Sequence, residues 1–448
     1  MQNIIKDSNR LFIGSDVPDT YQNPLGENKV YGVVKPVNES EVIASVKFAN
    51  EHNIPMIARG ANTGAAGSQV PINGGELIID LSLMNKVIDI DIETMTLTVE
   101  PGILLETVQK LADEHGLMYA PDPASKTSSI GGNVATNAGG MRAIKYGATR
   151  QNVRGLTVVL ADGTTLELGG KTIKDASGYD LLDLFIGSEG TLGVTTKVML
   201  KLIPKPKYEK SMVLAFDDAF TATDTVIDIL KSGFIPAALE LFDRESIKFS
   251  ESYLNRKFIS RKGHAYILLT IDGNNLEHIH QTLEKIGNIA DGKVVDQIEL
   301  NTDEAKAAWL MRDSILYGIM QTTYFEMLDE VVPINKFGQM IRYTKELEQK
   351  HGIRVLNFGH SGDGNIHTII MKDDLTDEQW QTKRQAFLDD LYDEVYRLGG
   401  LISAEHGVGY FKKEHFMKKT HPNNIQVMRT IKNALDPKNL LNPNKVFQ

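Results

Sequence analysis

The first part of the chain alternates between apolar positions at helical spacing and short apolar runs. Val42, Val46 and Ala49 recur at helical spacing, which predicts a helix that buries one face. Asn38 with Glu41 three residues later predicts the start of this helix as a capping box. Apolar runs at residues 54–58 and 76–81 are typical of buried strands.

The period then changes between strand and helix. Residues 95–99 alternate between apolar and polar positions, which predicts a half-exposed strand. Residues 103–114 have the amphipathic pattern of a helix. Residues 156–168 form two apolar runs on either side of Asp162-Gly163, a dipeptide typical of a hairpin turn.

Glycine divides the chain into differently built parts. More than half of the 38 glycines precede residue 205, and the middle of the chain is richer in helical patterns. Residues 59–67 and 121–140 consist largely of small and polar residues and are predicted as long loops. The Pro-Lys-Pro-Lys run at 204–207 is predicted as a linker. With 448 residues, two or three domains are expected.

Composition excludes several classes of function. The net charge of −10 and the sequence pI near 5.6 argue against broad nucleic-acid binding, which needs a basic surface. The chain has no cysteine, which excludes disulfides, thiolate catalysis and an iron–sulfur cluster held by this chain alone. No apolar run has the length of a signal peptide or a transmembrane helix, so a cytoplasmic protein is expected.

The two glycine-rich loops are suited to binding a pyrophosphate. Without side chains in the way, backbone N–H groups can approach an anion closely, and positive φ angles are allowed. Tight turns without a ligand are the alternative, although two such loops in one domain weigh against it. Neither loop has the Gly-x-Gly-x-x-Gly fingerprint or the Gly-Lys-Ser/Thr phosphate loop, so NAD and ATP are poorly supported.

A second group of candidate residues lies in the last hundred residues. His360 and His367 flank Ser-Gly-Asp-Gly-Asn-Ile, and Glu405-His406 follows later in another glycine-containing segment. Two imidazoles and a carboxylate suit zinc, and manganese or iron would also be accepted by these ligand types. The alternative is a pair of buried structural histidines, and the spacing of His360 and His367 does not by itself place them on one face.

Taken together, these motifs resemble the vanillyl-alcohol-oxidase-type FAD-binding family. Within it, the chain resembles the branch of D-lactate dehydrogenases, the flavin subunit of glycolate oxidase and D-2-hydroxyglutarate dehydrogenase. The resemblance covers about residue 30 to the C-terminus. It rests on Arg59 to Gly67, Pro121 to Ser125, Ile130 to Gly140, Gly187 to Gly193, the two histidine motifs and Leu441-Asn442-Pro443-Asn444-Lys445.

This resemblance implies an α+β fold and a domain order. We expect a FAD-binding domain in two subdomains at 1–204 and a substrate or cap domain at 205–405, with an antiparallel sheet and helices on one side. A C-terminal segment at 406–448 is expected to return to the FAD domain. The implied FAD-binding residues are Arg59, Gly60, Ala61, Asn62, Thr63, Gly64, Pro121, Asp122, Ser125, Ser129, Gly131, Gly132, Asn133, Thr136, Asn137, Gly139, Gly140, Glu189, Gly190, Gly193, Val194 and Asn442.

The family signature usually has glycine where Asn444 stands, and asparagine tolerates positive φ better than most residues. The first loop carries neither histidine nor cysteine, so non-covalent FAD is expected.

The resemblance also implies roles in catalysis. His360, His367 and Glu405 would bind the metal, and His406 would act as the base. Arg312 would bind the substrate carboxylate, since a guanidinium offers a bidentate fork.

Other residues are assigned less direct roles. Asn365 would contact the substrate or the cofactor, and Asp363 is a candidate for supporting the metal ligands. Lys174 is expected to be structural or to lie near the flavin edge.

These roles describe a dehydrogenase that oxidises a small D-2-hydroxy acid to the 2-keto acid, with hydride transfer to FAD. Met327 is apolar, which favours lactate or glycolate over a dicarboxylate. The electrons would leave to a quinone, an electron-transferring flavoprotein or an iron–sulfur subunit, and a homodimer is one option for assembly. The alternatives are a D-2-hydroxyglutarate-type dehydrogenase, a metal-independent alcohol oxidase, a metal-dependent hydrolase and a non-catalytic FAD subunit.

Overall fold

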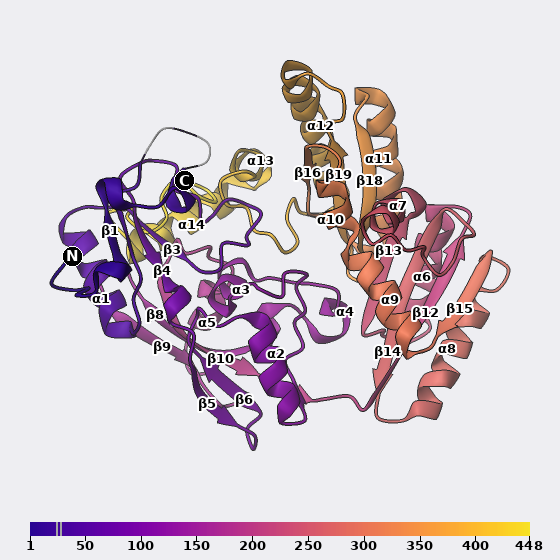
Figure 1. The fold of residues 1–448 in the computed structure, drawn as a ribbon, viewed down its shortest axis with the longest axis horizontal. Coiled ribbons are helices and arrows are strands. Elements are labelled where there is room, and N and C mark those ends of the chain that lie inside the picture. The colour runs from indigo at the N-terminus through magenta and orange to yellow at the C-terminus, as the bar shows by residue number, and fades with distance from the viewer. Residues whose placement is uncertain (24–25, 27–28) are drawn as a thin grey trace. The chain divides into compact units, whose positions relative to one another are not determined.

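The computed structural model describes residues 1–23, 26 and 29–448 (Figure 1). They form two compact units. Unit 1 comprises Met1–Gly139, Gly147–Lys205 and Glu405–Gln448, and unit 2 comprises Gly140–Tyr146 and Pro206–Ala404. The predicted ranges 1–204, 205–405 and 406–448 place residues 140–146 in the FAD-binding domain and Glu405 in the cap domain, whereas the two units place them in unit 2 and unit 1.

Unit 1 combines two larger sheets with surrounding helices. Its strands are β1 (Leu11–Ile13), β2 (Gly32–Val34), β3 (Met56–Arg59), β4 (Leu77–Asp80), β5 (Val87–Asp91), β6 (Thr96–Val99), β7 (Leu117–Met118), β8 (Val153–Val159), β9 (Thr165–Gly169), β10 (Val194–Lys201) and β11 (Ile203–Pro204). Its helices are α1 (Glu39–Glu51), α2 (Leu105–Glu114), α3 (Ile130–Thr136), α5 (Leu181–Phe185), α13 (Lys413–Lys419) and α14 (Pro422–Leu435).

The two sheets of unit 1 have different topologies. The first has the order β1-β2-β4-β3, and β2 and β3 run parallel to β4. The second has the order β5-β6-β10-β8-β9 and is antiparallel, which includes the predicted hairpin of β8 and β9. The C-terminal segment extends the first sheet, since Leu441 pairs in parallel with Met56 beside β3.

Three local predictions for unit 1 need correction. The strand predicted as half-exposed is β6, and it is buried on both faces. Lys171, just after β9, contacts Asp89 and Asp91 of β5, so the sheet curls and encloses the face that carries Thr96 and Thr98.

The second correction concerns the predicted capping box. Asn38 does cap α1, but the carboxylate of Glu41 accepts from Val37 N and Arg10 instead of completing the box.

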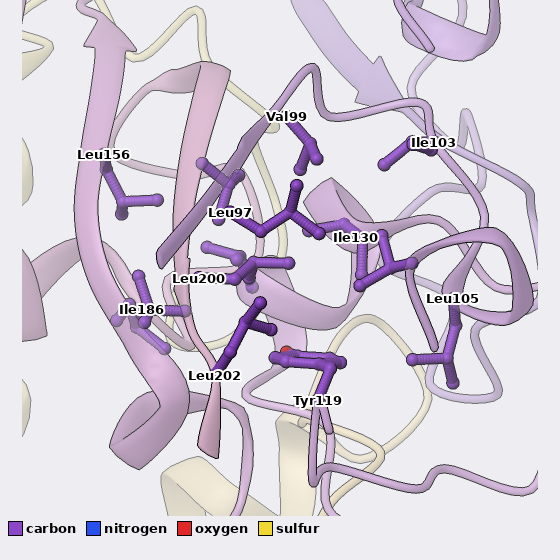
Figure 2. Close-up of a cluster of buried hydrophobic side chains, with 14 of the residues drawn as sticks. Leu97, Val99, Ile103, Leu105, Tyr119, Ile130, Leu156, Ile186, Leu200 and Leu202 are labelled. Atoms are coloured by element: carbon purple, nitrogen blue, oxygen red, sulfur yellow. The ribbon is translucent and has the colours of Figure 1, made fainter. Parts of the chain in front are cut away.

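The third correction concerns residues 121–140, which are not a continuous loop but contain α3. Ser129 caps this helix, and Ile130 and Val134, one turn apart, are fully buried. Figure 2 shows Ile130 among Leu97, Leu105 and Leu200 in a core cluster of unit 1. Burying such a side chain stabilises by about 1.5–3 kcal/mol, so this core fixes the glycine-rich helix in place.

Unit 2 is built on one antiparallel sheet. Its strands are β12 (Tyr208–Phe216), β13 (Ala238–Asp243), β14 (Ala265–Gly273), β15 (Asp296–Leu300), β16 (Phe325–Met327), β17 (Glu330–Val331), β18 (Arg354–His360) and β19 (Asn365–Met371). Its helices are α4 (Ala143–Tyr146), α6 (Ala219–Lys231), α7 (Arg244–Tyr253), α8 (Leu276–Ala290), α9 (Thr302–Asp313), α10 (Ile315–Met320), α11 (Phe337–His351) and α12 (Asp377–Arg397). The strand order is β15-β12-β14-β13-β18-β19-β16, and β17 also pairs with β19.

Helices cover both faces of this sheet, not one face as predicted. Phe242 and Tyr266 share a core with residues of α7, α9 and α10. The alternate positions, such as Leu241 and Ile267, are equally buried and face the side where α6, α8 and α11 contact the strands. The expected α+β class with an antiparallel second sheet is confirmed.

Every helix among the described residues is too short or too polar to span a membrane.

Candidate active site

The glycine-rich segments of unit 1 pack tightly against one another. A Cβ atom on Gly60 would lie 2.1 Å from Ser129 Oγ, and one on Gly131 would lie 2.6 Å from Pro101 Cβ. Ala61 N donates to Ser129 Oγ over 3.2 Å, which joins the first loop to the N-terminus of α3. Glycine is therefore required at position 60 for the first loop to approach α3, and at position 131 for α3 to approach Pro101.

Several predicted FAD-binding residues have left-handed backbone conformations. The φ angles of Asn62, Asn137, Glu189 and Asn442 are 62°, 52°, 52° and 44°. Asn444 has a φ angle of 64°, which explains how asparagine replaces the glycine of the family signature. Such conformations are uncommon outside glycine and concentrate at functional sites.

Two asparagines in unit 1 have polar atoms that are suited to a bound group. Asn442 Nδ2 donates to the carbonyls of Ser68 and Glu189, over 2.9 and 2.7 Å. Its Oδ1 atom is buried and has no hydrogen-bond partner among the described residues, and the same holds for Nδ2 of Asn133. A buried polar group without a partner is rare and calls for a ligand or water. These atoms therefore fit a polar cofactor in the predicted place.

Two charged residues predicted to bind FAD direct their side chains into the protein. The guanidinium of Arg59 lies over the ring of Tyr21, 4.6 Å from its centroid, and donates to Thr20 O. Asp122 accepts from Gln109 Nε2 over 3.0 Å and contacts Lys126. The predicted positions lie at the end of β3 and after it, between β7 and α3, in and just after α3, from the segment after α5 to the first residue of β10, and after α14.

Glu189 is engaged by the segment that follows His406. Its carboxylate accepts from Val408 N over 2.8 Å, from Gly409 N over 2.9 Å and from Ser68 Oγ. Burial raises the pKa of Glu189, although these donors favour the ionised form. A Cβ on Gly407 would lie 2.8 Å from the Glu189 carboxyl carbon. Glu189 therefore holds the turn that carries the predicted base.

Glu405 lies beside the end of the second glycine-rich segment in unit 1. A Cβ on Gly139 would be 2.6 Å from Glu405 Oε2, and Glu405 Oε1 is 3.8 Å from His406 Nε2. The predicted metal ligand and the predicted base thus belong to the same unit as the predicted flavin-binding loops.

In unit 2, the β18–β19 hairpin places the histidines on one face of the sheet. His360 pairs with Asn365 and Phe358 pairs with His367, so alternation along the strands puts these side chains on the same side. The rings of His360 and His367 have their centroids 5.2 Å apart at an interplanar angle of 86°. The spacing of the histidines could not show this, because strand register decides it.

A buried carboxylate on β13 connects His360 to Arg312. Glu240 Oε1 is 2.6 Å from His360 Nδ1, and Glu240 Oε2 forms an ion pair with Arg312. Burial opposes ionisation of Glu240, but the charge of Arg312 and the hydrogen bond from His360 outweigh it and lower its pKa. The Nε atom of Arg312 is buried and has no hydrogen-bond partner among the described residues, so it is suited to bind a carboxylate.

Asp329 organises the other side of this cluster. Its carboxylate accepts from Asn365 Nδ2 over 3.1 Å and from Ser403 Oγ over 2.7 Å, and it lies 4.0 Å from His367 Nδ1. Ala404 N donates to the carbonyl of Asp329 over 2.9 Å. Glu405 follows Ala404 by one peptide bond, at the point where the chain passes from unit 2 to unit 1.

Sequence reasoning missed Glu240 and Asp329. Each is fully buried, and each is an acidic residue in a strongly apolar stretch, Ala-Ala-Leu-Glu-Leu-Phe and Met-Leu-Asp-Glu-Val-Val. A charge in such a stretch is the signal that could have identified them, because buried charges need partners.

The chain matches two known protein families. Residues 31–169 match the family described as FAD binding domain, and residues 205–446 match the family described as FAD linked oxidases, C-terminal domain. The chain belongs to the FAD-linked oxidases. It is an FAD-dependent oxidoreductase, and the predicted family is confirmed.

This FAD-linked oxidase has close relatives over nearly its whole length. It is 36% identical to a D-lactate dehydrogenase of Anaerostipes hadrus, over 98% of this chain and 94% of that protein. It is also 36% identical to the glycolate oxidase subunit GlcD of Bacillus subtilis, over 98% and 93%. With a D-2-hydroxyglutarate dehydrogenase of Bos taurus it shares 33% identity, over 96% and 78%.

Solved structures show the same fold. The FAD-linked oxidase superimposes on p-cresol methylhydroxylase with a TM-score of 0.80 at 20% identity, covering 99% of this chain and 95% of that one. A 4-ethylphenol oxidase from Gulosibacter chungangensis gives a TM-score of 0.78 at 19% identity, with coverages of 99% and 96%.

Proposed function

We propose that this oxidoreductase is a dehydrogenase that oxidises a small D-2-hydroxy acid, D-lactate or glycolate, to the 2-keto acid with the help of a divalent metal. The observation that carries this proposal is the buried set of His360, His367, Asn365, Glu240 and Arg312 on one face of the unit 2 sheet. The names of the three relatives support the substrate class.

The residues of unit 1 fit FAD. When bound, FAD supplies the hydride acceptor, and the protein contributes placement and electrostatics. Gly60 lets the first loop pack against the N-terminus of α3, and Asn133 and Asn442 offer buried polar atoms to the cofactor. We expect non-covalent attachment, because the chain has no cysteine and the first loop has no histidine.

The donor set fits a divalent metal held by His360, His367 and Glu405, with zinc preferred and manganese or iron as alternatives. When bound, such an ion polarises the substrate hydroxyl and lowers its pKa. Asp329 supports this site, since its carboxylate lies near His367 Nδ1 and accepts from Ser403 Oγ and Ala404 N in the segment that leads into Glu405. Asp363 contributes to the hairpin turn, where its Oδ1 accepts from Asn365 N over 3.2 Å.

The remaining side chains bind the substrate and move the proton. Arg312 binds the substrate carboxylate through the Nε edge of its guanidinium, which Glu240 leaves open. Asn365 orients the hydroxyl side of the substrate. His406 accepts the hydroxyl proton, and the Glu189 clamp on Val408 and Gly409 keeps its segment in place.

Small substrates are favoured by the apolar surroundings in unit 2. Met327 pairs with Ile369 in the β16–β19 register and therefore lies on the same sheet face as His367. Phe358 shares this face and contacts both Arg312 and His367. Apolar neighbours stabilise a methyl group or hydrogen better than a second carboxylate.

A D-2-hydroxyglutarate-type dehydrogenase is the second candidate, supported by the name of the Bos taurus relative. A panel of D-lactate, glycolate and D-2-hydroxyglutarate distinguishes the two, because the dicarboxylate should reduce the flavin with the lowest kcat/KM. If D-2-hydroxyglutarate reduces the flavin with the highest kcat/KM, the D-2-hydroxyglutarate-type dehydrogenase becomes the preferred function.

The role of His406 is tested by His406→Asn. The variant keeps a side chain of similar polarity but removes the base, so anaerobic flavin reduction by D-lactate should slow by about 100- to 10,000-fold. The flavin absorbance per protein, which reports bound FAD, should stay unchanged. Reduction at the native rate would exclude His406 as the base.

The exit of electrons from the flavin stays a prediction. With no cysteine in the chain, an iron–sulfur relay would belong to a partner subunit, and a quinone or an electron-transferring flavoprotein are the other acceptors considered.

A further inference from the structure

The acid on β13 is the feature of unit 2 that the proposed roles leave unexplained. Glu240 is fully buried on a strand whose neighbours are apolar, and Leu239 and Leu241 beside it are 1% exposed. An ionised carboxylate in such surroundings is strongly unfavourable unless it is paired and hydrogen-bonded. Its two oxygens contact two different functional candidates, His360 and Arg312.

We propose that Glu240 is the positioning residue of the metal and substrate site, acting on both His360 and Arg312. This inference rests on the proposed metal-assisted function and deepens it. Glu240 itself touches neither the metal nor the substrate.

The effect on His360 follows from hydrogen-bond chemistry. A carboxylate has only acceptor atoms, so at a distance of 2.6 Å the Nδ1 atom of His360 must carry the proton. In the neutral ring the other nitrogen, Nε2, keeps its lone pair, so Nε2 is the atom that would bind a metal. Carboxylates that receive the second ring N–H of a ligating histidine fix its tautomer and orientation and raise its basicity.

The effect on Arg312 follows from the same carboxylate. Arg312 is 5% exposed, and Glu240 pairs with one of its terminal nitrogens while its Nε atom is left without a hydrogen-bond partner among the described residues. The ring of Phe358 lies 5.6 Å from the guanidinium carbon. One terminal nitrogen of the guanidinium is thus fixed by Glu240, the other lies 3.8 Å from Asp313 Oδ1, and the Nε–H is left for an anion.

A purely structural ion pair is the alternative, and unit 2 contains one for comparison. Glu251 pairs with Arg244 over 2.9 Å, also contacts Lys257, and accepts from Phe258 N over 3.0 Å. It is 5% exposed, and its partners as described include no histidine. Glu251→Gln is therefore a matched control for the loss of a buried carboxylate paired with an arginine.

The experiment compares metal affinity in FAD-loaded protein from which metals have been removed. Calorimetric titration with Zn²⁺ and with Mn²⁺ should show affinities about 10- to 100-fold weaker in Glu240→Gln than in the wild type, the range typical of residues that orient a metal ligand. Glu251→Gln should bind with wild-type affinity. His367→Ala should lose binding, which identifies the site.

A second variant guards against a general loss of folding. Glu240→Gln leaves Arg312 buried without its partner, whereas Glu240→Gln combined with Arg312→Met removes both charges and should restore the thermal midpoint. If Glu240 acts through His360, the double variant still binds metal weakly. In NMR spectra of isotope-labelled histidine, the wild type should contain a neutral histidine protonated at Nδ1 that disappears in Glu240→Gln.

The outcomes separate this inference from the proposed function. If the wild type binds metal and His367→Ala abolishes binding while Glu240→Gln matches Glu251→Gln, Glu240 is structural and the metal-assisted function stands. Wild-type affinity in the double variant would equally overturn the action through His360. A wild type that binds neither ion would contradict the proposed metal and the role of Glu240 together.

Discussion

Gly139 lies against the carboxylate of Glu405 within unit 1, with no room for a side chain. A Cβ atom there would be 2.6 Å from Glu405 Oε2 and 3.1 Å from Glu405 Cβ, so Gly139→Ala must displace the acid. We expect metal affinity to fall by about tenfold or more, the loss typical of a disturbed ligand, while FAD stays bound because Gly139 is assigned to it through backbone atoms alone, which alanine keeps. Metal titration and flavin absorbance of the purified variant measure the two effects.

Gly170→Ala is the control for this substitution. A Cβ on Gly170 meets nothing within 4 Å, and its backbone does not have a positive φ. It should leave both readouts unchanged. If Gly139→Ala binds metal as tightly as Gly170→Ala, Glu405 is not a ligand.

At the same scale, the sequence was informative about residue types but not about partners. The close backbone approach at Gly60 and Gly131 and the positive φ at Asn444 could be predicted, because they are local requirements of the backbone. The partners of Glu189 could not, since Val408 and Gly409 lie more than two hundred residues away in the sequence. Arg59 is a second example, because its place in a sequence motif does not reveal that its side chain lies over Tyr21.

Among the elements, the turn after α14 depends on a buried ion pair. Lys432 Nζ donates to Asp436 Oδ2, to Leu441 O over 2.8 Å and to Thr191 O over 2.7 Å, and Asp436 in turn accepts from Leu441 N. These bonds hold Leu441, the residue directly before Asn442. Lys432→Met leaves the Asp436 charge buried without its partner, which should lower the free energy of unfolding by about 3–5 kcal/mol. Denaturant unfolding of the FAD-loaded protein measures it.

The exposed Lys438 provides the comparison. Its Nζ atom donates to Asn50 O over 2.8 Å on the surface, so Lys438→Met should change the free energy of unfolding by less than about 1 kcal/mol. Equal losses in the two variants would show that the buried pair does not anchor this turn. FAD should dissociate from Lys432→Met at a lower temperature than from Lys438→Met, because Asn442 follows the anchored turn.

Element prediction succeeded where one period dominated and failed where tertiary contacts decided. The helix at 103–114 and the hairpin at 156–168 were found, because apolar spacing and the Asp-Gly turn are local signals. The helix α3 was missed, since its burial of Ile130 and Val134 outweighs the weak helix propensity of its glycines. The placement of His360 and His367 on the same sheet face could not be predicted either, because it follows from the β18–β19 register.

For the whole molecule, the sequence indicated two differently built units and the α+β class. It did not show that residues 140–146 belong to unit 2, where Asp272 accepts from Tyr146 over 2.6 Å and pairs with Lys145. These are long-range side-chain contacts, and apolar patterning contains no information about them. It also could not show helices on both faces of the unit 2 sheet, since both faces of each strand are simply apolar.

For the whole molecule, we propose that bound flavin oxidises a 2-hydroxy acid with help from a metal. The most direct test is the visible absorption spectrum of the purified protein before and after anaerobic addition of D-lactate, with and without prior removal of metal by a chelator. We expect a flavin spectrum that bleaches with D-lactate, bleaches far more slowly after chelation, and recovers its rate when Zn²⁺ or Mn²⁺ is returned. A flavin that stays oxidised with D-lactate and glycolate in the presence of metal, or one that bleaches equally fast after chelation, would contradict the claim.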